Sequence, residues 1–243
     1  MQGRHAVVWY RVLSLFSARA LTANAFSAVT LPCPAPATVK MALLAHLVAR
    51  DGPGRAQEHL GWLAPLAVAW AAPGRMAVSA AMVRVLKGDD DRDPTGEKGM
   101  EYKKSAALRE YVHMDEPFGI AILDVPGERR EDLAEGLERL SFLGVAESLV
   151  RAERPVEWVD ELPDGFVVLK ESETKEPGSE RGGWAVLLDD LGPRADFGRI
   201  SAYRKVGDPG PRLGVERVRM LVRLPLRVRR RTRDGYVLER VDR

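Results

Sequence analysis

Residues 7–47 read VVWYRVLSLFSARALTANAFSAVTLPCPAPATVKMALLAHL, and the order of patterns within them decides the fold. The apolar run over residues 7–16 predicts a buried first strand. Residues 17–30 are more polar and irregular, which favours a loop. An apolar helix is expected over residues 38–50, because the aspartate, glycines and proline that follow would end it. The stretch therefore predicts a strand, a loop and a helix, in that order.

Three prolines precede the expected helix, at positions 32, 34 and 36. Because proline lacks a backbone N–H and has a fixed φ, this run disfavours both a helix and a central strand. It predicts a stiff, extended approach to the helix. Thr38 stands where its hydroxyl could cap the first turn, so we expect the helix to begin there.

The chain has 243 residues, of which 45% are hydrophobic and 30% are charged. This length permits one large domain or two small ones, and the composition is typical of a globular protein. The net charge of +2 by itself implies no partner. The single cysteine, Cys33, excludes an internal disulfide framework and a cysteine zinc site, and it fits a reducing cytosol.

Two apolar stretches raise the question of a membrane. The first, near the N-terminus, is short, is interrupted by Arg11 and precedes no clean cleavage site, so a signal peptide is not expected. The second, over residues 60–72, contains Pro65 and is too short to span a bilayer. We therefore expect a cytoplasmic protein without membrane contact.

The rest of the first half alternates between apolar strand patterns and one amphipathic helix. Strands are expected over residues 66–70, 76–86, 118–125 and 145–152. Pro73-Gly74-Arg75 predicts a hairpin-like turn between the first two. Leucines at helical spacing predict a helix over residues 128–143, which Gly144 would end. This order of elements is that of a ferredoxin-like fold with an insertion.

The second half, residues 153–243, carries few helix signals. Short strands are expected over residues 166–169, 184–188, 217–224, 226–233 and 236–241. Pro225 is expected to separate the third of these from the fourth. Asp234-Gly235 is a strong turn dipeptide, so it predicts a hairpin between the last two. The sequence thus predicts one domain over residues 1–152 and a β-rich subdomain over residues 153–243.

Three places in the chain carry a resemblance to a known family. The first is the proline-rich run ending in Thr38, followed by an apolar helix with a small residue, Ala42. The second is RLSFLGVAESLV over residues 139–150, where a leucine-rich helix ends in Leu-Gly and Glu-Ser-Leu-Val follows. The third is a polar excursion, GDDDRDPTGEKG, over residues 88–99. Together they resemble the CRISPR-associated RAMP superfamily, and most closely its Cas-five family, the 5′-handle-binding subunit of type I Cascade complexes.

The resemblance covers roughly residues 7–152, and the family commonly has a glycine near Ala42, where this chain departs from the pattern. It implies an α+β fold with a ferredoxin-like (RRM-like) core, a β-hairpin thumb inserted around residues 87–117 and a small β-rich C-terminal part. It also implies a non-catalytic subunit that binds and caps the 5′ handle of crRNA in a complex that defends against foreign DNA. The implied partners are the backbone subunit, the large subunit and, in the assembled complex, target DNA. No cofactor is expected.

Candidate RNA-binding residues combine cations, polar groups and aromatic rings, which single-stranded RNA requires. They lie in the loop after the first strand, at the helix start, in the excursion and at the helix-to-strand junction. The set comprises Arg19, Thr22, Asn24, Phe26, Lys40, Lys98, Lys103, Lys104, Arg109, Gly144 and Ser148. For each, a plain structural role remains an alternative: a solvated loop, a surface charge or a helix stop.

One alternative function is a metal-independent endoribonuclease that processes precursor crRNA, as one branch of the family does. Cleavage without metal requires a general base near the 2′-hydroxyl and a cation near the scissile phosphate. His113, Tyr111 and Lys104 are the candidates for those roles. No clustered catalytic set is evident, and the aspartate run at residues 89–93 is more typical of a solvated loop than of a metal site.

A second alternative is a β-rich assembly protein that binds no nucleic acid. Its basis is a series of arginines at odd positions, which would share one face of an extended chain. These are Arg217, Arg219, Arg223, Arg227, Arg229, Arg231 and Arg233. Such a stripe could follow a phosphate backbone, serve a protein interface or simply discourage aggregation of a strand edge.

Overall fold

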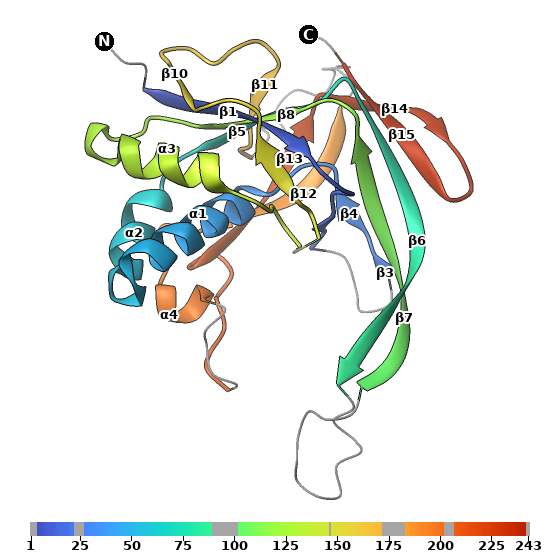
Figure 1. Cartoon of the computed structure of the whole chain (residues 1–243), viewed down its shortest axis with the longest axis horizontal. Coiled ribbons are helices and arrows are strands. Elements are labelled where there is room, and N and C mark those ends of the chain that lie inside the picture. The colour runs from blue at the N-terminus through green and yellow to red at the C-terminus, as the bar shows by residue number, and fades with distance from the viewer. Residues whose placement is uncertain are drawn as a thin grey trace, which may run out of the picture.

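The computed structural model describes residues 4–21, 27–88, 102–145, 147–171, 183–201 and 207–241. Within these ranges the chain is a mixed α+β protein with four α-helices and largely antiparallel sheets (Figure 1). The expectation of an α+β fold is confirmed at this level.

The first sheet is built around β1 (His5–Val12) and has the strand order β10-β1-β8-β5-β11. Its other strands are β5 (Val68–Ala71), β8 (Phe118–Ile122), β9 (Val150–Ala152), β10 (Glu157–Val159) and β11 (Phe166–Val168). β9 also pairs with β1, along the part of β1 that β10 leaves free. Every pairing in this sheet is antiparallel. The apolar run at the start of the chain therefore forms a central strand, as its pattern predicts.

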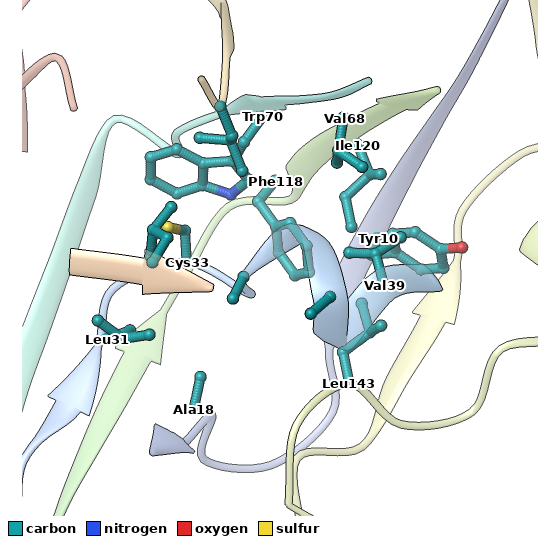
Figure 2. Packing of buried hydrophobic residues seen from close by; sticks show 14 of the residues in the cluster. Tyr10, Ala18, Leu31, Cys33, Val39, Val68, Trp70, Phe118, Ile120 and Leu143 are labelled. Atoms are coloured by element: carbon teal, nitrogen blue, oxygen red, sulfur yellow. The ribbon is translucent and has the colours of Figure 1, made fainter. Parts of the chain in front are cut away.

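Three helices cover one face of this sheet: α1 (Pro36–Asp51), α2 (Ala56–Leu63) and α3 (Arg130–Arg139). Their buried side chains pack on the even-numbered residues of β1 in one apolar core. Figure 2 shows Trp70, Phe118 and Tyr10 of the sheet and Val39 of α1 among the side chains of this core. The rings of Tyr10 and Phe118 lie 5.8 Å apart within the sheet, and the Tyr10 hydroxyl donates to the carbonyl of Leu137 on α3, which ties the sheet to the helix layer.

The opposite face of the first sheet has a smaller apolar cluster. Val7, Ala69 and Ala121 are buried there, and Trp9 packs edge-on against Phe166 of β11 at 5.5 Å. Strands from the second half of the chain thus complete the sheet that the first half begins.

Two helix boundaries differ from the sequence prediction. Helix α1 begins at Pro36, with Ala35 as its N-cap and no side-chain cap, so the prediction that Thr38 caps it is wrong. Proline suits the first helical position because no intrahelical acceptor exists for the N–H it lacks. Helix α3 ends at Arg139 rather than at Gly144, and the predicted strand 145–152 shortens to β9.

The second large sheet has five strands in the order β14-β15-β6-β7-β3. Its centre is a hairpin of β6 (Arg75–Gly88) and β7 (Tyr102–Met114), paired from Met76–Met114 to Gly88–Tyr102. At about 3.3 Å per residue β6 is roughly 45 Å long, and Figure 1 shows the hairpin extending away from the helices. The predicted hairpin-like turn between the strands at 66–70 and 76–86 is wrong, since β5 and β6 belong to different sheets.

The C-terminal strands lie in two places. β12 (Trp184–Leu191) and β13 (Arg217–Leu224) form a two-stranded ribbon that contacts α1. β14 (Leu226–Arg231) and β15 (Gly235–Arg240) form the predicted hairpin, and β15 pairs with β6. Pro225 separates β13 from β14, as predicted. Residues after 152 therefore contribute strands to both sheets that the first half builds.

The remaining elements are short. They are β2 (Ala18–Arg19), β3 (Ser27–Ala28), β4 (Thr30–Leu31), α4 (Phe197–Ile200) and the 3₁₀ turns Pro53–Arg55 and Gly127–Arg129. β2 pairs with β4 after β1, where the sequence predicts a loop. The loop over residues 171–181 and the excursion over 88–99 are two further predictions, and nearly all of both stretches lies outside the described residues.

Candidate nucleic-acid interface

A groove with a volume of about 440 Å³ runs along the exposed side of α1, and we call it the α1 groove. One wall is a single face of the helix, because its residues recur at helical spacing. This wall comprises Thr38, Met41, Ala42 and Ala45. The facing wall combines the β2–β4 segment with the loop after α3. It comprises Ala18, Arg19, Leu21, Leu31, Phe142, Gly144 and Val145.

The two parts of the facing wall are joined by a pair of buried hydrogen bonds. The hydroxyl of Ser148 donates to the carbonyl of Ser17 at 2.8 Å and accepts from the N–H of Ser17 at 2.8 Å. Ser148 has no exposed surface. This pair of hydrogen bonds, the Ser17–Ser148 clasp, therefore holds together two loops 131 residues apart in sequence.

Gly144 lies in the same wall with φ of +96°, a backbone conformation that side-chain-bearing residues rarely adopt. A Cβ at this position would stand 2.9 Å from the carbonyl oxygen of Ser17. Gly144 is thus required for the close approach of the two loops. Gly144 and Ser148, both predicted to contact RNA, have structural roles in this geometry, and Ser148 offers no exposed atom to a phosphate.

Arg19 is the cation best placed to meet a ligand in the groove. It is exposed, lies on β2, and has no hydrogen bond or ion pair within the described part of the chain. At the far end of the groove, Arg217 binds Asp189 at 2.8 Å. The groove therefore offers one free guanidinium, one paired guanidinium and an apolar interior, a combination suited to a nucleotide.

Lys40, predicted as a surface cation at the helix start, is buried instead. Its side chain is 2% exposed, and its Nζ binds a carboxylate oxygen of Asp190 at 2.7 Å and the carbonyl of Ala64 at 2.8 Å. Burial lowers the pKa of Lys40, an effect that the charge of Asp190 opposes. The ammonium links α1 to the β12–β13 ribbon and is not available to a phosphate, so the surface position assumed for Lys40 is wrong.

Several apolar side chains near the groove are exposed, which the sequence pattern does not predict. They are Leu13, Leu15, Leu21, Val29, Phe142 and Leu149. Phe142 is 46% exposed, lines the groove, and pairs through its backbone with Leu149. Thr22, Asn24 and Phe26, which the sequence predicts beside Arg19, lie outside the described residues.

The predicted cations of the excursion are distributed along the hairpin. Lys98 lies outside the described residues, and Lys103 and Lys104 occupy the far end of β7, opposite Lys87 and Leu86. Arg109 lies nearer the body and forms an ion pair with Glu147 at 3.6 Å. Of those cations that the structure describes, only Arg109 is therefore placed beside the wall of the α1 groove, and there it is paired with Glu147.

The candidate nuclease residues are not brought together. His113 and Tyr111 are two residues apart on β7 and share a face, whereas Lys104 is nine residues from His113 along the same strand. Nine residues of extended strand correspond to about 30 Å. His113 is exposed and its Nε2 lies 2.7 Å from Asp115. A single site containing all three side chains is incompatible with this strand.

Metal binding and membrane insertion are two further possibilities for the described ranges. Within them, no three histidine, cysteine, aspartate or glutamate side chains are grouped so that they could hold a metal ion. Over the same ranges, no helix is long and apolar enough to cross a membrane.

Comparisons with known proteins give similarities to solved structures only. No family model matches the sequence, and no curated protein matches it. A CRISPR protein from Archaeoglobus fulgidus is similar in structure with a TM-score of 0.45 and 16% identity, over 97% of this chain and 91% of that one. A chain of a CRISPR RNA-guided surveillance complex is similar with a TM-score of 0.40 and 12% identity, over 90% of both chains.

Proposed function

We propose that this chain is a non-catalytic, RNA-binding subunit of a Cascade-type CRISPR effector complex, and that it holds the 5′ handle of crRNA in the α1 groove. The observation that carries the proposal is the meeting of two segments on which the family resemblance rests. The stretch from β1 to α1 and the junction over residues 139–150 form the walls of one groove, although they are far apart in sequence.

The strand order of the first sheet supports a ferredoxin-like core for this proposal. In that fold two βαβ units interleave, so that the first strand lies between the third and the fourth. Here β1 lies between β8 and the β9–β10 pair, β5 lies beyond β8, and helices connect β1 to β5 and β8 to β9. The long β6–β7 hairpin interrupts this order between β5 and β8, where the family carries its thumb.

The groove has the chemistry that a splayed nucleotide needs. Phe142 offers an exposed ring on which a base could stack, and Arg19 offers a guanidinium to the adjacent phosphate. A volume of about 440 Å³ lies within the range of small-molecule pockets. On this proposal the base lies against the apolar face of α1 and the phosphate faces Arg19.

The hairpin supplies a surface for a neighbouring subunit. Met82 and Leu108 are paired across β6 and β7 and are 68% and 37% exposed, so they form an apolar spot on the projecting part of the hairpin. On this proposal the spot packs against the first backbone subunit, while the large subunit contacts the body near the groove. The exposed leucines at 13, 15 and 149 suit that second contact.

The test is to co-express the tagged chain with its genomic neighbours and a repeat array, and to sequence the RNA that co-purifies. Short RNAs with one fixed, repeat-derived 5′ end are expected. Arg19→Glu combined with Phe142→Ala should reduce the recovered RNA at least tenfold, because each removes a contact with the strand. Arg154→Glu with Leu221→Ala makes the same charge change and removes a comparably exposed apolar side chain that does not line the groove, so it serves as the control. RNA with random ends, or equal loss in the control, would contradict the proposal.

A further inference from the structure

A strongly basic surface lies at the outer edge of the hairpin sheet, away from the α1 groove. Five arginines of β14 and the following turn are all exposed, and we call this set the basic edge. It comprises Arg227, Arg229, Arg230, Arg231 and Arg233. β14 is the outermost strand of its sheet, and Figure 1 shows the β14–β15 hairpin beside β6. Arg217, Arg219 and Arg223, the first part of the arginine stripe, lie on β13 in a different sheet, beyond the break expected at Pro225.

An irregularity in β14 concentrates these charges. The register shifts between Val228 and Arg230, so Arg229 is an extra residue without a cross-strand partner. In a regular strand the side chains at 229 and 230 would point to opposite faces. Because of the bulge, three successive arginines at 229, 230 and 231 are exposed, and none is turned into the core.

Most of this charge is not neutralised by the protein itself. Glu239 on β15 accepts hydrogen bonds from Arg227 at 3.1 Å and from Arg229 at 2.8 Å. In the part of the chain that the structure describes, Arg230, Arg231 and Arg233 have no hydrogen bond or ion pair with an acidic side chain. The internal pairs fix one end of the edge and leave its other end free for an anionic partner.

The chemistry of the edge favours phosphates over a protein partner. Protein interfaces are anchored by buried aromatic and large apolar side chains. None of the large apolar side chains found exposed in the described ranges belongs to β14, its turn or β15. Arginine presents a rigid fork of donors that matches phosphate oxygens, so a surface of arginines without apolar anchors is suited to a nucleic-acid backbone.

The same surface favours a duplex over a single strand. Sites for single strands stack the unpaired bases on aromatic rings. The one aromatic residue of this hairpin, Tyr236, is half-buried and stacks on Trp184 with the ring centroids 5.4 Å apart. The backbone from Arg227 to Arg231 spans about 13 Å, which is long enough for several arginines to contact successive phosphates of one strand.

From this geometry we infer that the basic edge is a binding surface for double-stranded DNA, which it contacts through the phosphates of one strand. The inference does not depend on the RNA-binding role proposed for the α1 groove, since the two surfaces share no residue.

The test measures binding of the purified full chain to a fluorescently labelled 20-base-pair DNA by anisotropy, between 50 and 200 mM salt. The variant Arg230→Glu/Arg231→Glu/Arg233→Glu leaves the pairs to Glu239 intact. It should weaken binding at least tenfold at 100 mM salt. It should also make the negative slope of log K against log salt shallower by about 2.7, at about 0.9 for each lost phosphate contact. The control Arg151→Glu/Arg154→Glu/Arg194→Glu changes the net charge equally at exposed positions elsewhere and should bind like the original chain.

Each other outcome overturns the inference. Equal weakening in the control would show that net charge, rather than the basic edge, attracts DNA. If the chain does not bind duplex DNA at 50 mM salt, or if the basic-edge variant binds it unchanged, the basic edge is not a DNA-binding surface. If the variant loses single-stranded or double-stranded RNA of the same length but keeps duplex DNA, the assigned ligand is wrong. Thermal unfolding checks that each variant folds, and the Arg→Gln triple replaces any that does not.

Discussion

The Ser17–Ser148 clasp gives the sharpest quantitative prediction, because it is buried and its partners are few. In Ser148→Ala the N–H of Ser17 loses its acceptor, and Ser17 is itself only 8% exposed. The carbonyl of Ser17 retains a longer hydrogen bond, 3.4 Å, from the N–H of Val145. One buried donor is therefore orphaned and one acceptor is weakened.

The expected cost of Ser148→Ala follows from these two losses. Orphaning a buried donor costs about 1–3 kcal/mol, and an ordinary hydrogen bond contributes about 1 kcal/mol net. We expect a loss of about 2 kcal/mol in the free energy of unfolding, which is roughly a 30-fold change in the unfolding equilibrium. Urea unfolding followed by circular dichroism should show a lower midpoint with an unchanged slope.

A matched control is provided by Ser14→Ala. The hydroxyl of Ser14 also donates to a carbonyl of the same loop, that of Glu147 at 2.7 Å, but it is exposed to solvent. Water can replace that bond, so the expected cost is below about 0.5 kcal/mol. If Ser148→Ala costs no more than Ser14→Ala, the two loops are not held by the clasp and the reasoning about this wall of the groove fails.

Two further predictions concern buried groups. Asp190→Leu should destabilise the protein by about 3–5 kcal/mol, because it leaves the buried Lys40 ammonium without its carboxylate. Lys40→Met/Asp190→Leu should cost clearly less than Lys40→Met and Asp190→Leu together, and additive costs in this double-mutant cycle would exclude a coupled pair. Cys33 has no exposed surface, and burial raises the pKa of its thiol, so the folded protein should not react with a thiol reagent. The urea-unfolded chain should take up one equivalent of the reagent, and rapid labelling of the folded protein would contradict the burial of Cys33.

The periodic parts of the sequence predict their elements well. Alternation and apolar runs identify β1, β8 and the C-terminal hairpin, since the side chains that define those patterns are the ones the core needs. The leucines at 133 and 137 are buried on α3, as their spacing predicts. Local patterns succeed here because the cause of each element is local.

The errors have non-local causes. Gly144 looks like a helix stop, yet its conformation serves a close contact with Ser17, which lies more than a hundred residues earlier in the chain. Lys40 looks like a surface charge because its partner, Asp190, is 150 residues away. The turn at 73–75 looks like a hairpin, but β6 pairs with β7 and β15 instead of β5. A local stretch of sequence contains only one of the two residues or strands in each of these contacts, so it cannot predict the contact.

The part of the basic edge that binds Glu239 and the α1 groove lie on opposite faces of the hairpin sheet. Glu110 of β7, which is paired with Ala80 across the hairpin, accepts from the N–H of Thr30 beside the groove. Glu239, which binds arginines of the basic edge, is paired with Arg75 of the same strand β6. Positions 75 and 80 differ by an odd number, so their side chains point to opposite faces.

The two surfaces can therefore be tested separately. A guide strand in the α1 groove and a DNA duplex at the basic edge would not compete for space, and their charge-reversal variants should not interfere. Arg19→Glu should reduce RNA recovery without changing duplex binding, and the basic-edge variant should do the reverse. A protein in which either change abolishes both activities would contain one continuous site, and the assignment of two functions to two separate surfaces would be wrong.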